Sequence, residues 1–151
     1  MPQVHPPIPL PDPDATDALA RRMAGRVGAG DVLLLEGPIG AGKTAFARAL
    51  IHALGVAEDV PSPTYTLVQT YEAGLEIWHA DLYRLTHPDE AVELGLTDAF
   101  DTALCLVEWP ERLGADRPES ALTLRFSLEG EGRLVTFDSA DGTWEARLDD
   151  L

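Results

Sequence analysis

Apolar residues recur at helical spacing in two segments of the first third of the chain. The first segment predicts a helix over about residues 15–27, which Asp14 or Thr16 can cap. The second predicts a helix from residue 43 to about residue 54, with Gly55 as its stop. The apolar positions that define these helices are Leu19, Met23, Val27, Phe46, Leu50 and Leu54.

Other segments have the patterns of strands. Two nearly continuous apolar runs, residues 31–36 and 103–108, are typical of strands that are covered on both faces. Residues 66–72 and 75–81 predict a hairpin. The last third alternates at period two between glycine turns, which predicts an antiparallel meander. The three strands expected in it are 121–128, 133–138 and 143–148.

The order of these elements predicts an α/β protein. Strands that alternate with helices favour a three-layer domain with a mixed sheet, followed by the C-terminal antiparallel meander. Residues 88–95 add a short helix. The first 14 residues hold six of the twelve prolines, which predicts an extended lead-in. We therefore expect one domain over residues 1–151.

Composition and charge narrow the possible partners. The chain has 26 acidic against 11 basic side chains, a net charge of −15, so direct contact with DNA, tRNA or an anionic membrane is not expected. No apolar run approaches the roughly 20 residues of a membrane span. A single cysteine, Cys105, inside an apolar run favours a reducing compartment, and we expect a cytoplasmic protein. One cysteine and four scattered histidines also argue against a structural zinc site.

The turn between the first apolar run and the second helix matches the P-loop pattern. It reads Gly37-Pro38-Ile39-Gly40-Ala41-Gly42-Lys43-Thr44, and Ala45 follows in the helix. In such a loop, backbone N–H groups from Gly40 to Thr44 point at phosphates, Lys43 supplies a point charge and the Thr44 hydroxyl binds Mg²⁺. A strand before and a helix after are the context that this motif requires. The simpler alternative is a glycine-rich turn that binds nothing.

Lys43 is the only lysine in the chain; the other ten basic residues are arginines. The P-loop site takes a compact ammonium on a flexible stem, which arginine cannot replace. The same count excludes the Asn-Lys-x-Asp motif by which common GTPases recognise guanine. We therefore expect adenine, and ATP with Mg²⁺, as the ligands.

Three polar residues after the loop are further candidates. Thr64, in Ser62-Pro-Thr-Tyr-Thr, can place a hydroxyl near the γ-phosphate, or can belong to a polar loop. Asp81 and Glu108 each end a predicted strand, where a carboxylate beside a P-loop binds Mg²⁺ or orients water. Their two roles can be exchanged, and each can instead be a solvated acid at a strand end. Trp109 can stack on the base or on a partner, or can anchor the core.

The motifs taken together resemble a known family. The chain is similar to the bacterial TsaE family of ATPases in tRNA threonylcarbamoyladenosine biosynthesis. The resemblance spans the chain in order, although Ala80 stands where an aromatic residue is common and the C-terminal third matches loosely. The matching blocks are residues 37–44, Ser62-Pro-Thr-Tyr-Thr-Leu-Val68, His79-Ala-Asp-Leu-Tyr-Arg-Leu85, Glu93-Leu-Gly-Leu96 and Val107-Glu-Trp-Pro110.

The resemblance implies a fold, an activity and partners. Members are small cytoplasmic ATPases with a modified P-loop fold. They act with TsaB and TsaD, which assemble threonylcarbamoyl on adenosine 37 of tRNAs that read ANN codons. By this resemblance Thr44 and Glu108 would hold Mg²⁺ with Asp81 close by, and Trp109 would belong to the site. Thr16 and Arg133 would lie near the nucleotide.

We therefore expect an ATP-binding protein with low intrinsic hydrolysis that a TsaB–TsaD complex stimulates, with catalytic roles for Lys43, Asp81 and Glu108. Contact with tRNA would come only through the partners. Two alternatives are a small nucleoside or nucleotide kinase, and a regulator that binds ATP without hydrolysing it.

Overall fold

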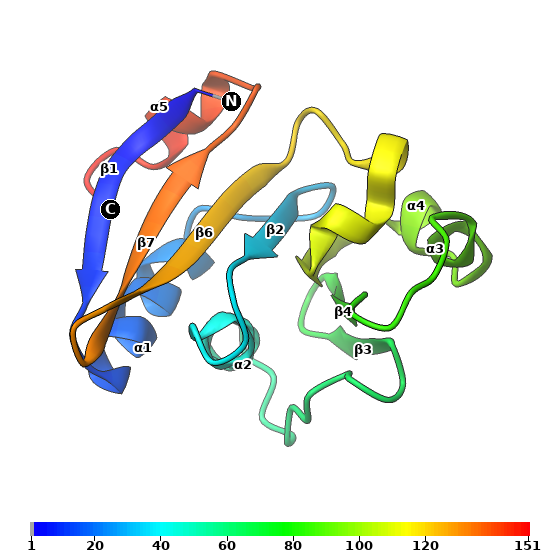
Figure 1. Ribbon diagram of the computed structural model, residues 1–151, viewed down its shortest axis with the longest axis horizontal. Helices are drawn as coiled ribbons and strands as arrows, with labels where there is room; N and C mark the ends of the chain where they lie inside the picture. Colours follow the sequence, from blue (N-terminus) through cyan, green and yellow to red (C-terminus); the bar gives the residue numbers. More distant parts are fainter. Residues whose placement is uncertain (1) are drawn as a thin grey trace.

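A mixed seven-stranded sheet in the order β1-β7-β6-β2-β5-β4-β3 forms the centre of the protein (Figure 1). The structure is a computed structural model and describes residues 2–151. The strands are β1 (Gln3–Leu10), β2 (Val32–Glu36), β3 (Val68–Glu72), β4 (Glu76–Asp81), β5 (Leu104–Glu108), β6 (Leu122–Glu129) and β7 (Gly132–Asp138). The helices are α1 (Pro13–Ala24), α2 (Lys43–Ala53), α3 (Asp89–Glu93), α4 (Leu96–Ala99), the 3₁₀ segment η1 (Pro110–Asp116) and α5 (Thr143–Arg147).

The middle of the sheet is parallel. Strand β2 pairs in parallel with β5 on one side and β6 on the other, and β4 pairs in parallel with β5. Parallel strands are covered on both faces and are therefore continuous in apolar residues. Residues 32–35 and all of β5 are buried, as the two apolar runs predicted.

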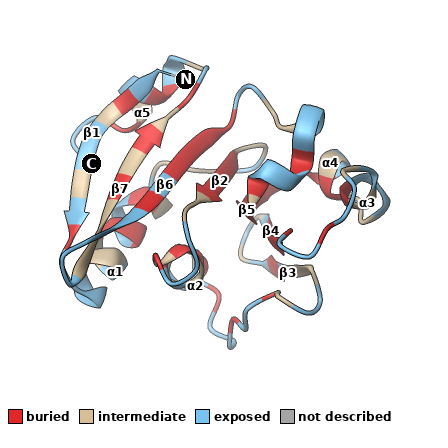
Figure 2. Cartoon of the chain, viewed as in Figure 1, coloured by how far each residue is buried: buried red, intermediate tan, exposed pale blue. Residues whose placement is uncertain are grey.

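Helices cover the two faces of this sheet. Successive side chains of a strand point to opposite faces, so each central strand contributes apolar residues to the core on both faces. On one face the core contains Met23 of α1, Phe46 of α2 and Trp144 of α5. On the other it contains Leu96 of α4 and Leu113 of η1. Figure 2 shows the buried positions concentrated along the central strands. The predicted α/β class with a mixed sheet is thus confirmed.

The two ends of the sheet are antiparallel. Strands β3 and β4 form the hairpin that the sequence predicted. At the other end β6 pairs with β7, and β7 pairs with β1. None of the described helices combines the length and the apolar character that a membrane span needs.

The predicted meander is wrong in its third strand. Residues 143–148 lie mostly in the helix α5, and the strand that pairs with β7 is β1, from within the proline-rich lead-in. Trp144 and Leu148 are four residues apart and both buried, so in this short segment a period of two and a helical period fit equally well. Asp141 also accepts a hydrogen bond from the Thr143 N–H (3.0 Å), which favours a helix start.

The first helix begins earlier than predicted. Its N-cap is Asp12, whose carboxylate accepts a hydrogen bond from the Ala15 N–H (2.9 Å), rather than Asp14 or Thr16. Pro13 occupies the first turn, where its fixed φ angle and missing N–H suit a helix start. The helix ends at Ala24 with Gly25 as its C-cap, earlier than the predicted end near residue 27.

Candidate functional site

The loop of residues 37–44 connects β2 to α2, as the sequence predicted. Gly37, Gly40 and Gly42 have φ angles of 139°, 82° and 102°, which side chains with a Cβ rarely adopt. At Gly37 a Cβ would also overlap the backbone carbonyl of Phe126 in β6. The loop therefore folds back against β6. Gly42 caps α2 without a side chain, which leaves the first N–H groups of the helix available to an anion.

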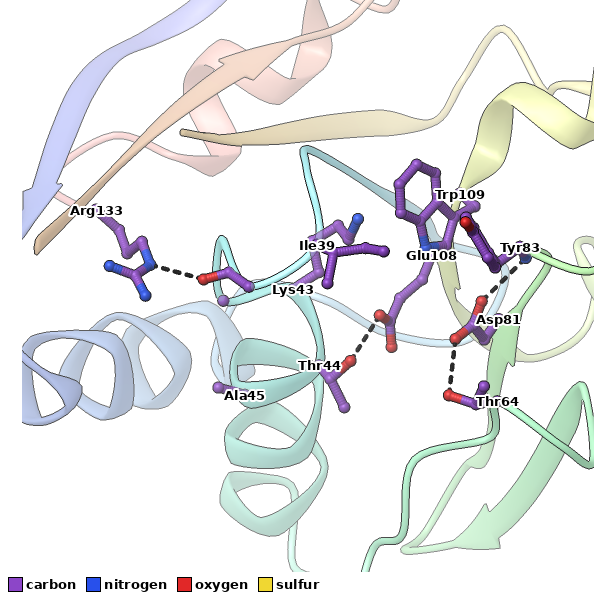
Figure 3. A pocket seen from close by; sticks show the side chains of 12 residues that line it. Ile39, Lys43, Thr44, Ala45, Thr64, Asp81, Tyr83, Glu108, Trp109 and Arg133 are labelled. Atoms are coloured by element: carbon purple, nitrogen blue, oxygen red, sulfur yellow. Dashed lines mark hydrogen bonds between the residues drawn. The ribbon is translucent and has the colours of Figure 1, made fainter. Parts of the chain in front are cut away.

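A cavity of about 550 Å³ opens above this loop (Figure 3). Residues from the loop, from the ends of β4 and β5 and from the start of β7 meet in it. They are Ile39, Gly40, Gly42, Lys43, Thr44, Ala45, Thr64, Asp81, Tyr83, Glu108, Trp109 and Arg133.

Lys43 is folded into the loop, with 5% of its surface exposed. Its ammonium donates a hydrogen bond to the Gly37 carbonyl and lies 3.6 Å from the centroid of the Trp109 ring. Burial lowers the pKa of Lys43 below its ordinary value, and the nearby carboxylates of Glu108, Glu111 and Asp81 partly oppose that shift. The ammonium is thus held by a neutral carbonyl and an aromatic face, both of which an anionic ligand can replace.

Glu108, at the end of β5, contacts the helix that follows the loop. Its Oε1 accepts a hydrogen bond from the Thr44 hydroxyl (2.7 Å), and its Oε2 lies 2.7 Å from Nε2 of His79. Both Glu108 and His79 are buried, with 2% and 0% of their surfaces exposed. The carboxylate is therefore fixed between α2 and β4.

Asp81 lies beside Glu108 in the β4–β5 register but has different partners. It accepts hydrogen bonds from the Thr64 hydroxyl (3.3 Å) and from the Tyr83 N–H (3.0 Å). Figure 3 shows the two carboxylates on neighbouring strands, with Glu108 directed at Thr44 and Asp81 at Thr64. The sequence left their roles exchangeable, and the tertiary structure gives the two carboxylates different partners.

The donor set fits Mg²⁺ in its chemistry. Thr44, Glu108 and Asp81 offer only oxygen, which Mg²⁺ prefers. Residues 2–151 hold no cluster of three or more His, Cys, Asp or Glu side chains arranged around a metal. Mg²⁺ is usually held in proteins through one or two side chains, with water and phosphate oxygens completing its coordination.

Trp109 and Tyr83 form an aromatic wall of the cavity. Their ring centroids are 4.9 Å apart, and Tyr83 is 44% exposed. Trp109 has a φ angle of 58°, which is uncommon for a residue with a large side chain. Backbone strain of this kind concentrates at functional sites.

Arg133 and Thr16 lie on the side of the loop away from the carboxylates. The Arg133 Nε donates a hydrogen bond to the Gly40 carbonyl (3.0 Å). Thr16 lines a second cavity of about 400 Å³, which shares Gly42, Ala45 and Arg133 with the first. The two cavities are therefore neighbours on either side of the start of α2.

Three residues predicted for nucleotide binding do not line the main cavity. Thr16 is in the second cavity, Pro38 lines a separate depression next to Trp109, and the Ala41 side chain is buried in the core. The Ala41 N–H donates to the Pro38 carbonyl (3.1 Å), which keeps the loop tightly turned. All the other predicted residues line the main cavity. Their roles in ligand binding stay predictions.

Two residues of the site were not predicted from the sequence. Tyr83 lines the cavity, and His79 contacts Glu108. His79 stands two residues before Asp81 in an alternating strand, so both side chains belong to one face of the sheet. This spacing alone would have predicted that His79 lies on the same face of the sheet as Asp81.

The fold and the loop define a class, an α/β protein whose glycine-rich loop links a parallel strand to a helix opposite two strand-end carboxylates. The family model described as "Threonylcarbamoyl adenosine biosynthesis protein TsaE" matches residues 10–135. The chain belongs to the TsaE family, which is involved in tRNA threonylcarbamoyladenosine biosynthesis.

Individual relatives agree with that assignment. The chain is 36% identical over 143 residues to the Bacillus subtilis (strain 168) "tRNA threonylcarbamoyladenosine biosynthesis protein TsaE", covering 93% of this chain and 89% of the relative. It is 39% identical over 106 residues to the protein of the same name from Haemophilus influenzae, covering 69% and 67%. A solved structure described as "Crystal structure of Bacillus subtilus YdiB" superposes with a TM-score of 0.79 at 28% identity, covering 96% and 92%.

Proposed function

We propose that this protein binds ATP with Mg²⁺ in the main cavity and hydrolyses it slowly, as an accessory to TsaB- and TsaD-type partners in forming threonylcarbamoyladenosine at position 37 of tRNA. The observation that carries the proposal is the convergence of Lys43, Thr44 and Glu108 on one cavity at the N-terminus of α2.

The phosphates are bound by the loop. The N–H groups at the start of α2 and the positive end of the helix dipole attract a polyphosphate. Lys43 exchanges the Gly37 carbonyl for the β- and γ-phosphate oxygens. The cost of that exchange is small because the interaction it gives up is with a neutral group.

Thr44 and Glu108 hold the magnesium ion, and Asp81 orients the attacking water. When bound, Mg²⁺ would supply positive charge that offsets the negative charge of the phosphate oxygens. Glu108 is assigned to the metal because it already contacts Thr44, whereas Asp81 contacts Thr64 on the far side. Thr64 helps to hold Asp81 and faces the γ-phosphate.

The second cavity suits the adenine base. It adjoins the main cavity at Gly42 and Arg133. Its lining combines the apolar Leu10 and Pro11 with Thr16 and with the carboxylates of Asp12, Asp17 and Glu131. Apolar contact around a planar base, with a hydroxyl and a guanidinium at the margin, is typical of ligand sites. Arg133 lies between the two cavities and contacts the ribose or the α-phosphate.

Partner proteins supply the contact with tRNA. A net charge of −15 disfavours binding to a phosphate backbone. Ile39 and Tyr83 line the main cavity and are exposed, and Tyr65, the neighbour of Thr64 in the chain, is exposed as well. Exposed large apolar side chains are typical of surfaces that bind proteins.

The test measures ATP affinity and phosphate release, with and without a TsaB–TsaD complex. We expect slow hydrolysis that the complex stimulates. Lys43→Ala is expected to weaken ATP binding at least tenfold, because charge-assisted hydrogen bonds contribute about 1.5–3 kcal/mol. Arg22→Ala is the matched control, since it removes one charge from an exposed position on α1 and leaves the loop intact.

Three results would contradict the proposal. Lys43→Ala with unchanged ATP affinity would exclude the loop as the binding site. ATP binding without hydrolysis, even with partners present, would favour a regulator. Robust phosphoryl transfer to a nucleoside in an acceptor screen would favour a kinase.

A further inference from the structure

We propose that His79 is a positioning residue for the metal site: its Nε2–H holds the Glu108 carboxylate so that the opposite oxygen faces Thr44 and Mg²⁺. This inference rests on the metal role proposed for Glu108. It assigns a function to a side chain that touches neither the cavity nor the loop.

His79 has an unfavourable position for folding alone. It lies in β4 on the same face as Ile77, which belongs to the apolar core under α2, and its surface is fully buried. Its Nδ1 has no hydrogen-bond partner within residues 2–151. A polar group buried in this way costs free energy, which an aliphatic side chain would avoid. The histidine is therefore better explained by its contact with Glu108 than by packing.

The hydrogen-bond network assigns the tautomer. Nε2 lies 2.7 Å from Oε2 of Glu108. An unprotonated Nε2 would direct a lone pair at a carboxylate oxygen, which is repulsive. In a ring with one proton, that proton is on Nε2 and is donated to Glu108. Nδ1 then carries no proton. The atom of His79 without a hydrogen-bond partner is therefore an acceptor rather than a donor.

This contact divides the two oxygens of Glu108 between two tasks. Oε2 is occupied by His79, and Oε1 accepts from the Thr44 hydroxyl at 2.7 Å. Without the His79 donor the carboxylate can rotate and present either oxygen to the helix. Groups that orient a metal ligand from behind commonly change metal affinity 10–100-fold when they are removed.

The test compares three substitutions of His79 by electron paramagnetic resonance titration of Mn²⁺ into the ADP-bound protein. His79→Gln places an amide N–H close to the position of Nε2. His79→Asn keeps a polar group that is too short to reach Glu108, and His79→Leu removes the donor. We expect Mn²⁺ affinity to fall 10–100-fold in the Asn and Leu variants and to be largely retained in the Gln variant. ADP affinity measured in EDTA should be unchanged in all three.

His52→Leu is the matched control, because His52 contacts the Val56 carbonyl (2.9 Å) at the far end of α2. Wild-type Mn²⁺ affinity in the Asn variant, or an equal loss in the Gln and Asn variants, would overturn the inference while leaving the proposed function standing. If the Leu variant does not fold, the Gln–Asn comparison decides. If wild type binds Mn²⁺ no better than Thr44→Val, the proposed metal site and the role of His79 both fail.

Discussion

The sheet has a parallel half centred on β2, β4 and β5 and an antiparallel half of β1, β6 and β7, and the two halves differ in how they hold their polar side chains. In the parallel half, β4 and β5 hold His79 and Glu108 fully inside the protein by short side-chain hydrogen bonds. In the antiparallel half, β6 and β7 are also joined by an ion pair near the surface, Arg125 with Asp138 at 3.1 Å, where Arg125 is 51% exposed. Buried contacts fix geometry, whereas exposed ion pairs contribute little free energy.

This difference follows the division between the residues of the candidate site and the residues that stabilise the fold. The candidate metal and phosphate residues come from the loop of residues 37–44, α2, β4 and β5, and the antiparallel half adds Arg133 to the cavity. The antiparallel half instead contributes to the core together with Trp144 of α5, and its strand β6 contacts the loop through the Phe126 backbone at Gly37. Substitutions in one half should therefore change binding, and substitutions in the other should change stability.

The largest effect on stability and on ATP binding is expected at Gly37, where the two halves meet. Gly37→Ala places a Cβ against the Phe126 carbonyl at a φ angle of 139°. Strained backbone and overpacking together should lower the free energy of unfolding by about 2–5 kcal/mol and weaken ATP binding as well. Urea denaturation and ATP titration measure both. Gly74→Ala, also at positive φ but in open space at the hairpin turn, should cost less and leave binding unchanged.

Trp144→Phe tests the antiparallel half by itself. The Trp144 Nε1–H donates to the Ser120 carbonyl (2.9 Å), and the ring is 1% exposed. Losing that hydrogen bond and part of the ring should lower the free energy of unfolding by about 1–3 kcal/mol. ATP affinity of the folded variant should equal that of wild type. Reduced ATP affinity would show that the two halves are coupled.

Thr44→Val tests the parallel half by the removal of a proposed metal ligand. We expect about tenfold weaker ATP binding in Mg²⁺ and unchanged binding in EDTA, because the hydroxyl contributes only through the ion. Thr70→Val on the exposed side of β3 is the control. An equal loss of affinity in both media would assign Thr44 to phosphate binding instead.

The smallest effect is expected on the pH dependence of stability, through the ion pairs of Glu36. Burial alone would raise the pKa of Glu36, but the hydrogen bond and charge of Arg117, with the charge of Arg125, lower it below its ordinary value of 4.5. A carboxyl whose pKa is lowered on folding stabilises the protein above the unfolded pKa, and this contribution is lost as pH falls through the folded pKa.

Glu36→Gln should therefore cost less than about 1 kcal/mol at pH 7 and flatten the loss of stability below about pH 4.5. Thermal unfolding measured from pH 3 to pH 7 provides the comparison. Glu129→Gln, at an exposed site on β6, should reproduce the wild-type acid profile. A wild-type profile in Glu36→Gln would show that the ion pairs contribute nothing to acid sensitivity.

The elements of the parallel half could be predicted from the local sequence because short-range patterns define them. Continuous apolar runs predicted β2 and β5, and the glycines of residues 37–44 predicted the turn between β2 and α2. The secondary structure of the two chain ends could not be predicted in the same way. A strand at Gln3–Leu10 depends on a partner at Gly132–Asp138, more than 120 residues away, and propensity alone cannot supply that pairing.

The sequence by itself determined the loop of residues 37–44, the strand-end carboxylates and the family, because each depends on residue types at fixed local spacing. Only the tertiary structure decided which carboxylate meets Thr44, since Asp81 and Glu108 stand at equal positions on adjacent strands. It also gave His79 its partner. Contacts across strands depend on register and on the direction of each side chain, and these are set when the sheet assembles.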